Sequence, residues 1–324
     1  MVSVESATPV WVRELAGIRP NIRQSAAWIA LGIVVACTAF FVPALVSPGH
    51  LPTLLRQAAP LGLLALGQTV LVLGRGIDLS VGGVVGMVSV VLAGSLARQA
   101  GVGVVLALCF AVGIIVGLLN GALVAWGRLS PLIATLGTGF VLTGAMLIYT
   151  GGAPTGEVPA AIRQLASGRI LGVTWGTYLW LVAAVAIGAA LKFTWAGRWV
   201  SAIGSNPDAA GLSGVRIPLV QLGSHVVSSL CAVLAGLVLA GFVGVGTLGA
   251  GQGLMMNSLA ATVVGGTVLA GGRGGITGSV GGALLLTVLA ALLTGVGAGE
   301  PGQLLMQGIV ILAAAFLFRT RHTR

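Results

Sequence analysis

Charge is the first thing that this sequence lacks. Only 7% of its 324 residues are charged, against roughly 25% in soluble globular proteins, and six of them are acidic. So few ionic groups could not cover the surface of a soluble protein of this length. A hydrophobic content of 57% and a mean hydropathy of +1.09 indicate instead that much of the surface faces lipid. The sequence therefore predicts an all-α polytopic membrane protein.

The residue patterns of catalytic and metal sites are also missing. Three cysteines lie within apolar runs and offer neither zinc spacing nor an even set for disulfides. Three histidines have no metal-ligand spacing, and no Ser/His/Asp set converges. The G-x-G-x-x-G match at Gly244–Gly249 ends an apolar run without a strand–helix unit, and no phosphate loop occurs. We expect no enzyme, no metal, no cofactor and no ATP site in this chain.

The basic residues outnumber the acids by ten, which could suggest nucleic acid. They are scattered between apolar runs, however, with few aromatic residues among them, and do not form one basic face. A cytoplasmic excess of positive charge in a membrane protein explains them better. We expect lipid contact and no nucleic-acid partner.

The apolar residues fall into runs long enough to cross a bilayer, which needs about 20 residues per helix. The first run is too long for a signal-peptide core, so we expect it to stay uncleaved. Residues 1–24 and 319–324 are then tails, and 25–318 form one transmembrane domain. The ten predicted spans are 25–47, 54–73, 79–97, 102–126, 131–149, 177–196, 219–245, 255–271, 276–296 and 302–318.

Ten spans place both termini on the same side of the membrane. With both termini inside, twelve of the sixteen basic residues lie in the cytoplasm, as the positive-inside rule requires. The outer group is Arg56, Arg98, Arg163 and Arg169. In this orientation the loop 150–176 is external and the loop 197–218 is cytoplasmic.

Glycine is abundant, with 53 residues, at more than twice the usual share of about 7%. Small residues let helix backbones approach closely inside a membrane. Some of these glycines belong to an internal repeat: GQTVLVLGRG at Gly67–Gly76 and GGTVLAGGRG at Gly265–Gly274, identical at seven of ten positions, with SVGG soon after each. Chance in a Gly/Val-rich chain is the alternative. A true repeat predicts two related halves, as in many transporters.

Asp78 is the one acid between the N-terminal tail and residue 150. A carboxylate at mid-bilayer costs about 2.5–3.5 kcal/mol, so we expect Asp78 to be capped, paired or hydrated. The glycine-rich break before it and Ser80 after it favour a cap that accepts N–H groups of the next helix. Pairing with Arg75 is a second possibility, and a proton or cation site a third.

Polar residues within the predicted spans could line a translocation path or simply join helices. A buried amide needs hydrogen-bond partners, so Asn120 and Asn257 are the leading candidates. The path candidates are Gln68, Asp78, Ser80, Asn120, Thr135 and Asn257, with Thr138, Ser228, Ser229 and Thr262 as further in-span polar residues. Trp126, Trp175, Trp180, Trp195 and Trp199 fall near span ends, which is typical of an aromatic belt.

The cytoplasmic loop contains the densest turn and capping signals. Asn206 suits an N-cap, Pro207 the first helical position and Asp208 the positive end of the helix dipole. Gly211 and Gly214 limit the helix to about two turns. A merely connecting loop needs no such helix, so we expect a docking element for a cytoplasmic partner, with an ordinary connector as the alternative.

Four ordered blocks extend these observations to a family. They read GRGIDLSVG (74–82), GLLNGALVAWGRLSPLIATLGT (117–138), AIGSNPDAAGLSGV (202–215) and LAATVVGGTVLAGGRGGITGSVGGALL (259–285). With these blocks the chain resembles, over about residues 50–318, the permease subunit of bacterial ABC sugar importers of the ribose/monosaccharide type. Branched-chain amino acid permeases belong to the same wider group.

The resemblance implies an inner-membrane subunit that translocates a small polyhydroxylated solute. Its implied partners are cytoplasmic subunits that bind ATP-Mg, a periplasmic or extracellular solute-binding protein, and a second permease copy or paralogue. It also implies that the block 202–215 couples to the ATPase. We assign this coupling to Gly204, Asn206, Pro207, Asp208, Ala209, Ala210 and Gly214. The alternative function is an ion-coupled secondary carrier that uses Asp78.

Overall fold

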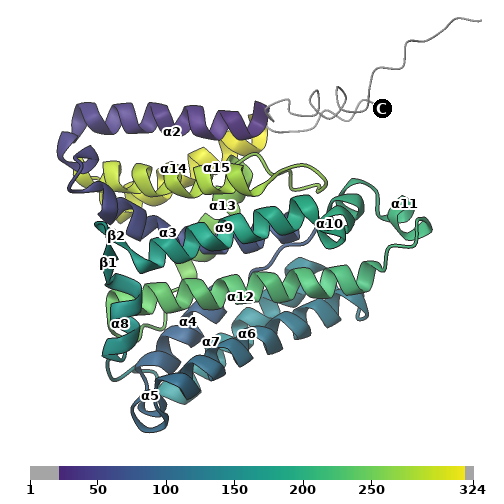
Figure 1. The fold of residues 1–324 in the computed structure, drawn as a ribbon, viewed down its shortest axis with the longest axis horizontal. Helices are drawn as coiled ribbons and strands as arrows, with labels where there is room; N and C mark the ends of the chain where they lie inside the picture. Colours follow the sequence, from purple (N-terminus) through teal and green to yellow (C-terminus); the bar gives the residue numbers. More distant parts are fainter. Residues whose placement is uncertain (1–21, 318–324) are drawn as a thin grey trace, which may run out of the picture.

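The computed structural model describes residues 22–317, and nearly all of its elements are helices (Figure 1). The predicted tails, 1–24 and 319–324, therefore lie outside the described residues except for 22–24. The helices are α2 (Ile22–Phe41), α3 (Leu51–Leu73), α4 (Val81–Ala93), α5 (Ser95–Ala100), α6 (Val102–Ala125), α7 (Pro131–Thr150), α8 (Ala160–Ser167), α9 (Trp175–Phe193), α10 (Trp195–Ser205), α11 (Pro207–Leu212), α12 (Ile217–Val243), α13 (Gln252–Val264), α14 (Ile276–Gly295) and α15 (Glu300–Leu317), with a 3-10 turn η1 (Pro43–Val46).

Six of the described helices are long and apolar enough to cross a membrane: α3, α6, α7, α9, α12 and α14. Two shorter apolar helices lie at Ser25–Phe41 and Val81–Ala93. Large apolar side chains such as Phe40 and Ile148 are 81% and 86% exposed, as expected where lipid replaces water. An all-α polytopic membrane protein is confirmed, whereas the count of ten spans and their orientation stay predictions.

Glycine shortens two of the predicted spans. The run 79–97 is helical only to Ala93, because Gly94 adopts an extended conformation and α5 starts anew. The run 255–271 leaves the helix after Val264, and Gly266 then takes a left-handed φ of +86°. Both runs are apolar, as predicted, but a hydropathy pattern does not show where glycine ends a helix.

The predicted outer loop 150–176 has structure of its own. It contains α8 and a short antiparallel pair, β1 (Arg169–Ile170) and β2 (Val173–Thr174). In Figure 1 these elements lie at one end of the molecule, and α10 and α11 lie at the opposite end. The two loops singled out from the sequence therefore mark the two ends of the helical bundle.

The two copies of the sequence repeat do not share one local structure. Gly67–Leu73 belongs to α3, whereas the matching residues from Gly265 onward form turns after α13. Both SVGG segments do lie at the beginning of the following helix, α4 or α14. Seven identical positions therefore do not impose one backbone, since the surrounding tertiary contacts differ.

Helix α12 occupies the centre of the fold and packs along α3, α4 and α6 (Figure 1). Its approach to α6 is close because Gly113, Gly117 and Gly121 form a stripe on α6. A Cβ atom at Gly117 would lie 2.6 Å from the Cα atom of Val226, and one at Gly121 would lie 2.7 Å from that of Leu222. The expected role of glycine in backbone contact is confirmed here.

Trp180 does not belong to an aromatic belt. Its side chain is fully buried, and its ring covers Gly62 of α3, where a Cβ atom would lie 2.1 Å from Cε2. The other four tryptophans were grouped with it because all five fall near predicted span ends. For Trp180 this position in the sequence was misleading, since the glycine on a neighbouring helix provides the space for the indole.

Candidate functional site

A buried polar cluster surrounds the Asp78 carboxylate. Oδ1 accepts hydrogen bonds from the backbone N–H of Ser80, at 2.8 Å, and from the Ser80 hydroxyl. Oδ2 accepts one from the hydroxyl of Ser228 on α12, at 2.9 Å. Oδ1 thus bonds the backbone N–H of Ser80, the N-cap residue that precedes α4, so the predicted cap is met at that residue and not at the N–H groups inside the helix. Three hydrogen bonds offset part of the cost of burying this group.

The cluster extends to two further helices. The Asn120 amide on α6 donates to the Ser80 hydroxyl at 2.8 Å and accepts from Thr138 on α7 at 2.7 Å. Thr135, also on α7, accepts from the backbone N–H of Leu79 at 3.0 Å. These contacts fix the segment before α4 against both helices.

Gln68 completes what we call the Asp78 cluster. Its amide nitrogen donates to the backbone carbonyl of Asp78, and its amide oxygen accepts the Asp78 N–H at 3.4 Å. The cluster comprises Gln68, Asp78, Ser80, Asn120, Thr135, Thr138 and Ser228, all of them buried. It joins α3, α6, α7 and α12 to one loop, so it orients four helices at a single point.

Five of the six path candidates therefore meet in the Asp78 cluster, and the sixth does not. Asn257 lies on α13 in a separate pocket. Of the further in-span polar residues, Thr262 bonds to the carbonyl of Ala65, and the buried Ser229 hydroxyl has no partner within the described part of the chain. Every side chain of the cluster is closed off from solvent in this conformation, and its role in translocation stays a prediction.

The helix expected in the loop 197–218 is present as α11. The Asn206 side chain accepts the backbone N–H of Ala209 at 3.1 Å, which is the predicted N-cap, and Pro207 is the first helical residue. Gly214, with φ +82°, follows the helix end. Ala210 faces inward, whereas Leu212 is 91% exposed. An exposed leucine next to polar and small residues is suitable for contact with another protein.

Gly204 anchors the preceding helix α10 between two loops. A Cβ atom at this position would lie 1.9 Å from the carbonyl oxygen of Leu73 and 2.3 Å from the nitrogen of Gly272. The N–H of Gly272 donates to the Leu73 carbonyl at 2.9 Å. The first residues of both GRG motifs of the repeat, 74–76 and 272–274, therefore lie next to the C-terminal end of α10 in space. Only glycine allows this three-way backbone contact.

Arg75 does not pair with Asp78. Its Nε donates to the carbonyl of Gly204 at 2.9 Å and its Nη2 to that of Ser205 at 3.1 Å. The guanidinium thereby satisfies carbonyl groups at the C-terminus of α10, where cations are favoured. Arg75 itself has a left-handed φ of +66°. Sequence reasoning missed this role because the two partners are 129 residues apart.

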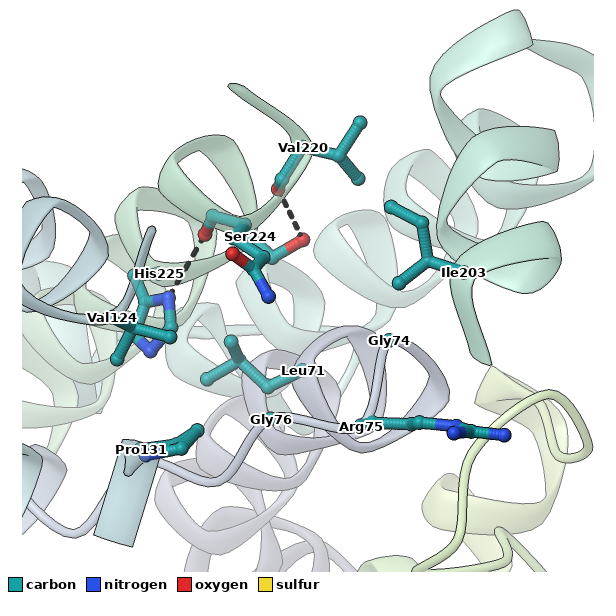
Figure 2. Close-up of a pocket in the computed structure, with 11 residues that line it drawn as sticks. Leu71, Gly74, Arg75, Gly76, Val124, Pro131, Ile203, Val220, Ser224 and His225 are labelled. Atoms are coloured by element: carbon teal, nitrogen blue, oxygen red, sulfur yellow. Dashed lines mark hydrogen bonds between the residues drawn. The ribbon is translucent and has the colours of Figure 1, made fainter. Parts of the chain in front are cut away.

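A small cavity of about 20 Å³ separates the end of α10 from α12 (Figure 2). That volume fits about one water molecule. Leu71, Arg75 and Ile203 lie on its wall, and His225 lines its far side. The His225 side chain is buried, with Nδ1 2.9 Å from the Gln221 carbonyl oxygen and no partner for Nε2 among the described residues. A water-sized space and an unpaired ring nitrogen thus occur where α10, α12 and the end of α3 meet.

These features define a polytopic α-helical membrane protein in which an exposed capped helix is connected to a buried polar cluster. The sequence profile of a family described as branched-chain amino acid transport system, permease component, matches residues 51–315. The chain is also similar to the autoinducer 2 import system permease protein LsrC of Shigella flexneri, with 33% identity over 243 residues that cover 75% of this chain and 71% of that protein. No solved structure matches it.

A second relative is the same-named protein of Salmonella typhi, 35% identical over 247 residues that cover 75% of this chain and 70% of the relative. The chain therefore belongs to the family described as branched-chain amino acid transport system, permease component. The resemblance to ABC-type permeases is confirmed, as is the expectation of a multi-pass protein of the bacterial inner membrane. It is a transport subunit and not a catalytic enzyme.

Proposed function

We propose that this chain is the membrane subunit of an ATP-driven importer and translocates a small polyhydroxylated solute, most simply a monosaccharide. Cytoplasmic subunits bind ATP-Mg and hydrolyse it. A periplasmic or extracellular solute-binding protein delivers the solute, and a second permease copy or paralogue completes the membrane unit. The family match and the import systems named for its relatives support this proposal.

The proposal that the ATPase acts on the permease through α11 rests on one set of contacts. The exposed helix α11 follows directly on α10, and the end of α10 is bonded to Arg75. Arg75 stands three residues before Asp78, whose backbone and carboxylate are held by α3 and α12. A partner that docks on α11 is therefore linked to the helix-orienting cluster through a short chain of contacts.

The proposed mechanism uses this link. Closure of the ATPase subunits displaces α11 and α10, the loop 74–80 moves with Arg75, and the helices joined at the Asp78 cluster change their relative tilt. Access then alternates between the outer and the inner side. In the proposed orientation of ten spans with both termini inside, α11 is cytoplasmic, as ATPase docking requires.

The decisive experiment is co-purification of the tagged permease with its ATPase from native membranes. Leu212→Asp should remove the ATPase from the purified complex, because it places a charge on the exposed surface of α11. Leu171→Asp is the matched control: Leu171 is 93% exposed in the turn between β1 and β2, and these strands lie at the end of the fold opposite α11 (Figure 1). A permease that purifies alone under several mild conditions, with wild-type α11, would overturn the importer.

The ion-coupled carrier is not favoured. Both carboxylate oxygens of Asp78 accept hydrogen bonds from serine residues, and the side chain is fully buried. The family consists of permease components of transport systems with further subunits. A deletion of Asn206–Gly214 distinguishes the two functions, because it should abolish ATP-driven uptake without preventing membrane insertion, whereas a carrier should continue to transport.

A further inference from the structure

A second polar site lies away from the Asp78 cluster. A cavity of about 370 Å³ opens between α3, α13, α14 and α15. His50 and Gln57, at the beginning of α3, lie on its wall. The connection from α2 to α3 is at the end of the molecule opposite α11 (Figure 1). In the proposed orientation this is the outer side, from which an imported solute arrives.

The wall of this cavity is polar but carries no acid, lysine or arginine. Three carboxamides, from Gln57, Asn257 and Gln307, project from three different helices, and Thr287 and Thr294 add hydroxyl groups. The remaining wall is apolar and includes leucines of η1, α3, α13 and α14. Arg56, next to Gln57 in the sequence, is turned toward the ring of Phe242, with its guanidinium carbon 4.1 Å from the ring centre.

The amides are free to bind a ligand. None of the three makes a hydrogen bond with any residue that the structure describes. Each offers one acceptor and two donors. Hydroxyl groups both donate and accept, so they match carboxamides, and the apolar wall suits the C–H face of a sugar ring. Pockets of about 300–1,000 Å³ are the usual size for small-molecule sites.

We propose that this cavity is a binding site for a neutral polyhydroxylated solute and that it excludes zwitterionic amino acids. The inference rests on the proposed function and deepens it, because the family description names branched-chain amino acids. An amino acid would bring an ammonium and a carboxylate into a wall without a charged partner, and burying unpaired charges is costly. Asn257 and Gln57 are the central contacts.

Thiol labelling of the full-length permease in nanodiscs tests this site directly. Ala291→Cys, in a Cys37→Ser background, is reacted with a charged, water-soluble thiol reagent with and without D-ribose; Ala291 lines the cavity but carries none of its amide groups. Ribose should slow labelling by the factor 1 + [ribose]/Kd, which is about twofold when its concentration equals Kd. L-leucine should not slow it. Gln252→Cys is the control, since Gln252 is exposed on α13 and does not line the cavity.

Each other outcome overturns the site. If leucine protects as well as ribose, the site is not selective for polyhydroxylated solutes. If neither protects, the cavity does not bind the ligand. If the cysteine is not labelled at all, lipid or a second copy of the chain covers the cavity. Ala290→Cys repeats the test at a neighbouring wall position if Ala291→Cys does not fold. Retained ATPase co-purification with unprotected cysteines would reject this site alone, whereas loss of the ATPase from the wild-type complex would reject the importer itself.

Discussion

The side chain of Arg75 donates a hydrogen bond to the carbonyl of Gly204 at 2.9 Å, and this contact joins the loop that carries Asp78 to the helix that leads into α11. Both ends of the contact lie in sequence blocks of their own, 74–82 and 202–215. The bond therefore connects the part of the chain that we expect to receive the energy of ATP hydrolysis with the part that orients the helices.

Replacing Arg75 should uncouple transport from hydrolysis. Arg75→Ala removes two charge-assisted hydrogen bonds, of which one is exposed, so we expect a stability loss of about 1.5–3 kcal/mol, mostly from the bond to Gly204. ATPase activity should persist in the complex while uptake falls strongly. Both are measured in proteoliposomes. Arg128→Ala is the control, because Arg128 is exposed and also has a left-handed φ. Equal effects of the two variants would contradict the coupling role.

Changes at Asp78 should lower stability in a graded manner. Asp78→Ala leaves the donors of Ser80 and Ser228 unmet, at about 1–3 kcal/mol for each buried group. Asp78→Asn retains an acceptor for Ser80, and its new N–H group can donate to the Ser228 hydroxyl, so its loss should be smaller. Thermal unfolding in nanodiscs measures both, with the exposed Glu157→Gln as control.

The same variants separate the importer from the ion-coupled carrier. With ATP held constant, uptake by the wild type and by Asp78→Asn should not respond to a protonophore. If Asp78→Asn abolished uptake without lowering the unfolding temperature, and the wild type lost uptake with the protonophore, Asp78 would be an ion-coupling residue after all.

Two glycines of the block 202–215 should respond in opposite directions to alanine. Gly204→Ala forces a Cβ atom to within 1.9 Å of a carbonyl oxygen, so the end of α10 must separate from both GRG loops. Gly211→Ala meets only an ordinary contact of 3.6 Å with Ile217 inside α11, and alanine stabilises a helix by up to about 1 kcal/mol over glycine. Unfolding temperature and uptake should both fall for Gly204→Ala, whereas for Gly211→Ala the unfolding temperature should rise slightly and uptake should persist. A tolerated Gly204→Ala would contradict the close packing.

The parts of the fold that depend on neighbours in sequence were predictable. Asn206 and Pro207 define the start of α11 by local capping chemistry, and Asp78 bonds to Ser80 two residues away. The gathering of Gln68, Asn120 and Thr135 around Asp78 was not specified by any spacing. The sequence identified these residues as polar and buried but could not tell which helices meet.

Long-range contacts account for what sequence reasoning missed. Trp180 fits a space made by Gly62, more than a hundred residues away, and no periodicity reports such a pair. The repeat copies at Gly67 and Gly265 differ in backbone because their surroundings differ. The amides of Gln57, Asn257 and Gln307 come from three separate helices, so only the assembled fold brings them to the wall of one cavity.

The glycine stripe of α6 has a mechanical consequence. Gly117 and Gly121 meet the backbone of α12 directly. Glycine has no side chain, so no change of rotamer on α6 could accommodate a shift of the helices at these two positions. Sliding at this contact would require backbone atoms to separate, so we expect α6 and α12 to move together while α3 and α7 change their tilt against this pair. Since α12 begins soon after α11 and Ser228 of α12 bonds to Asp78, we expect a displacement of α11 to reach the Asp78 cluster through this helix pair.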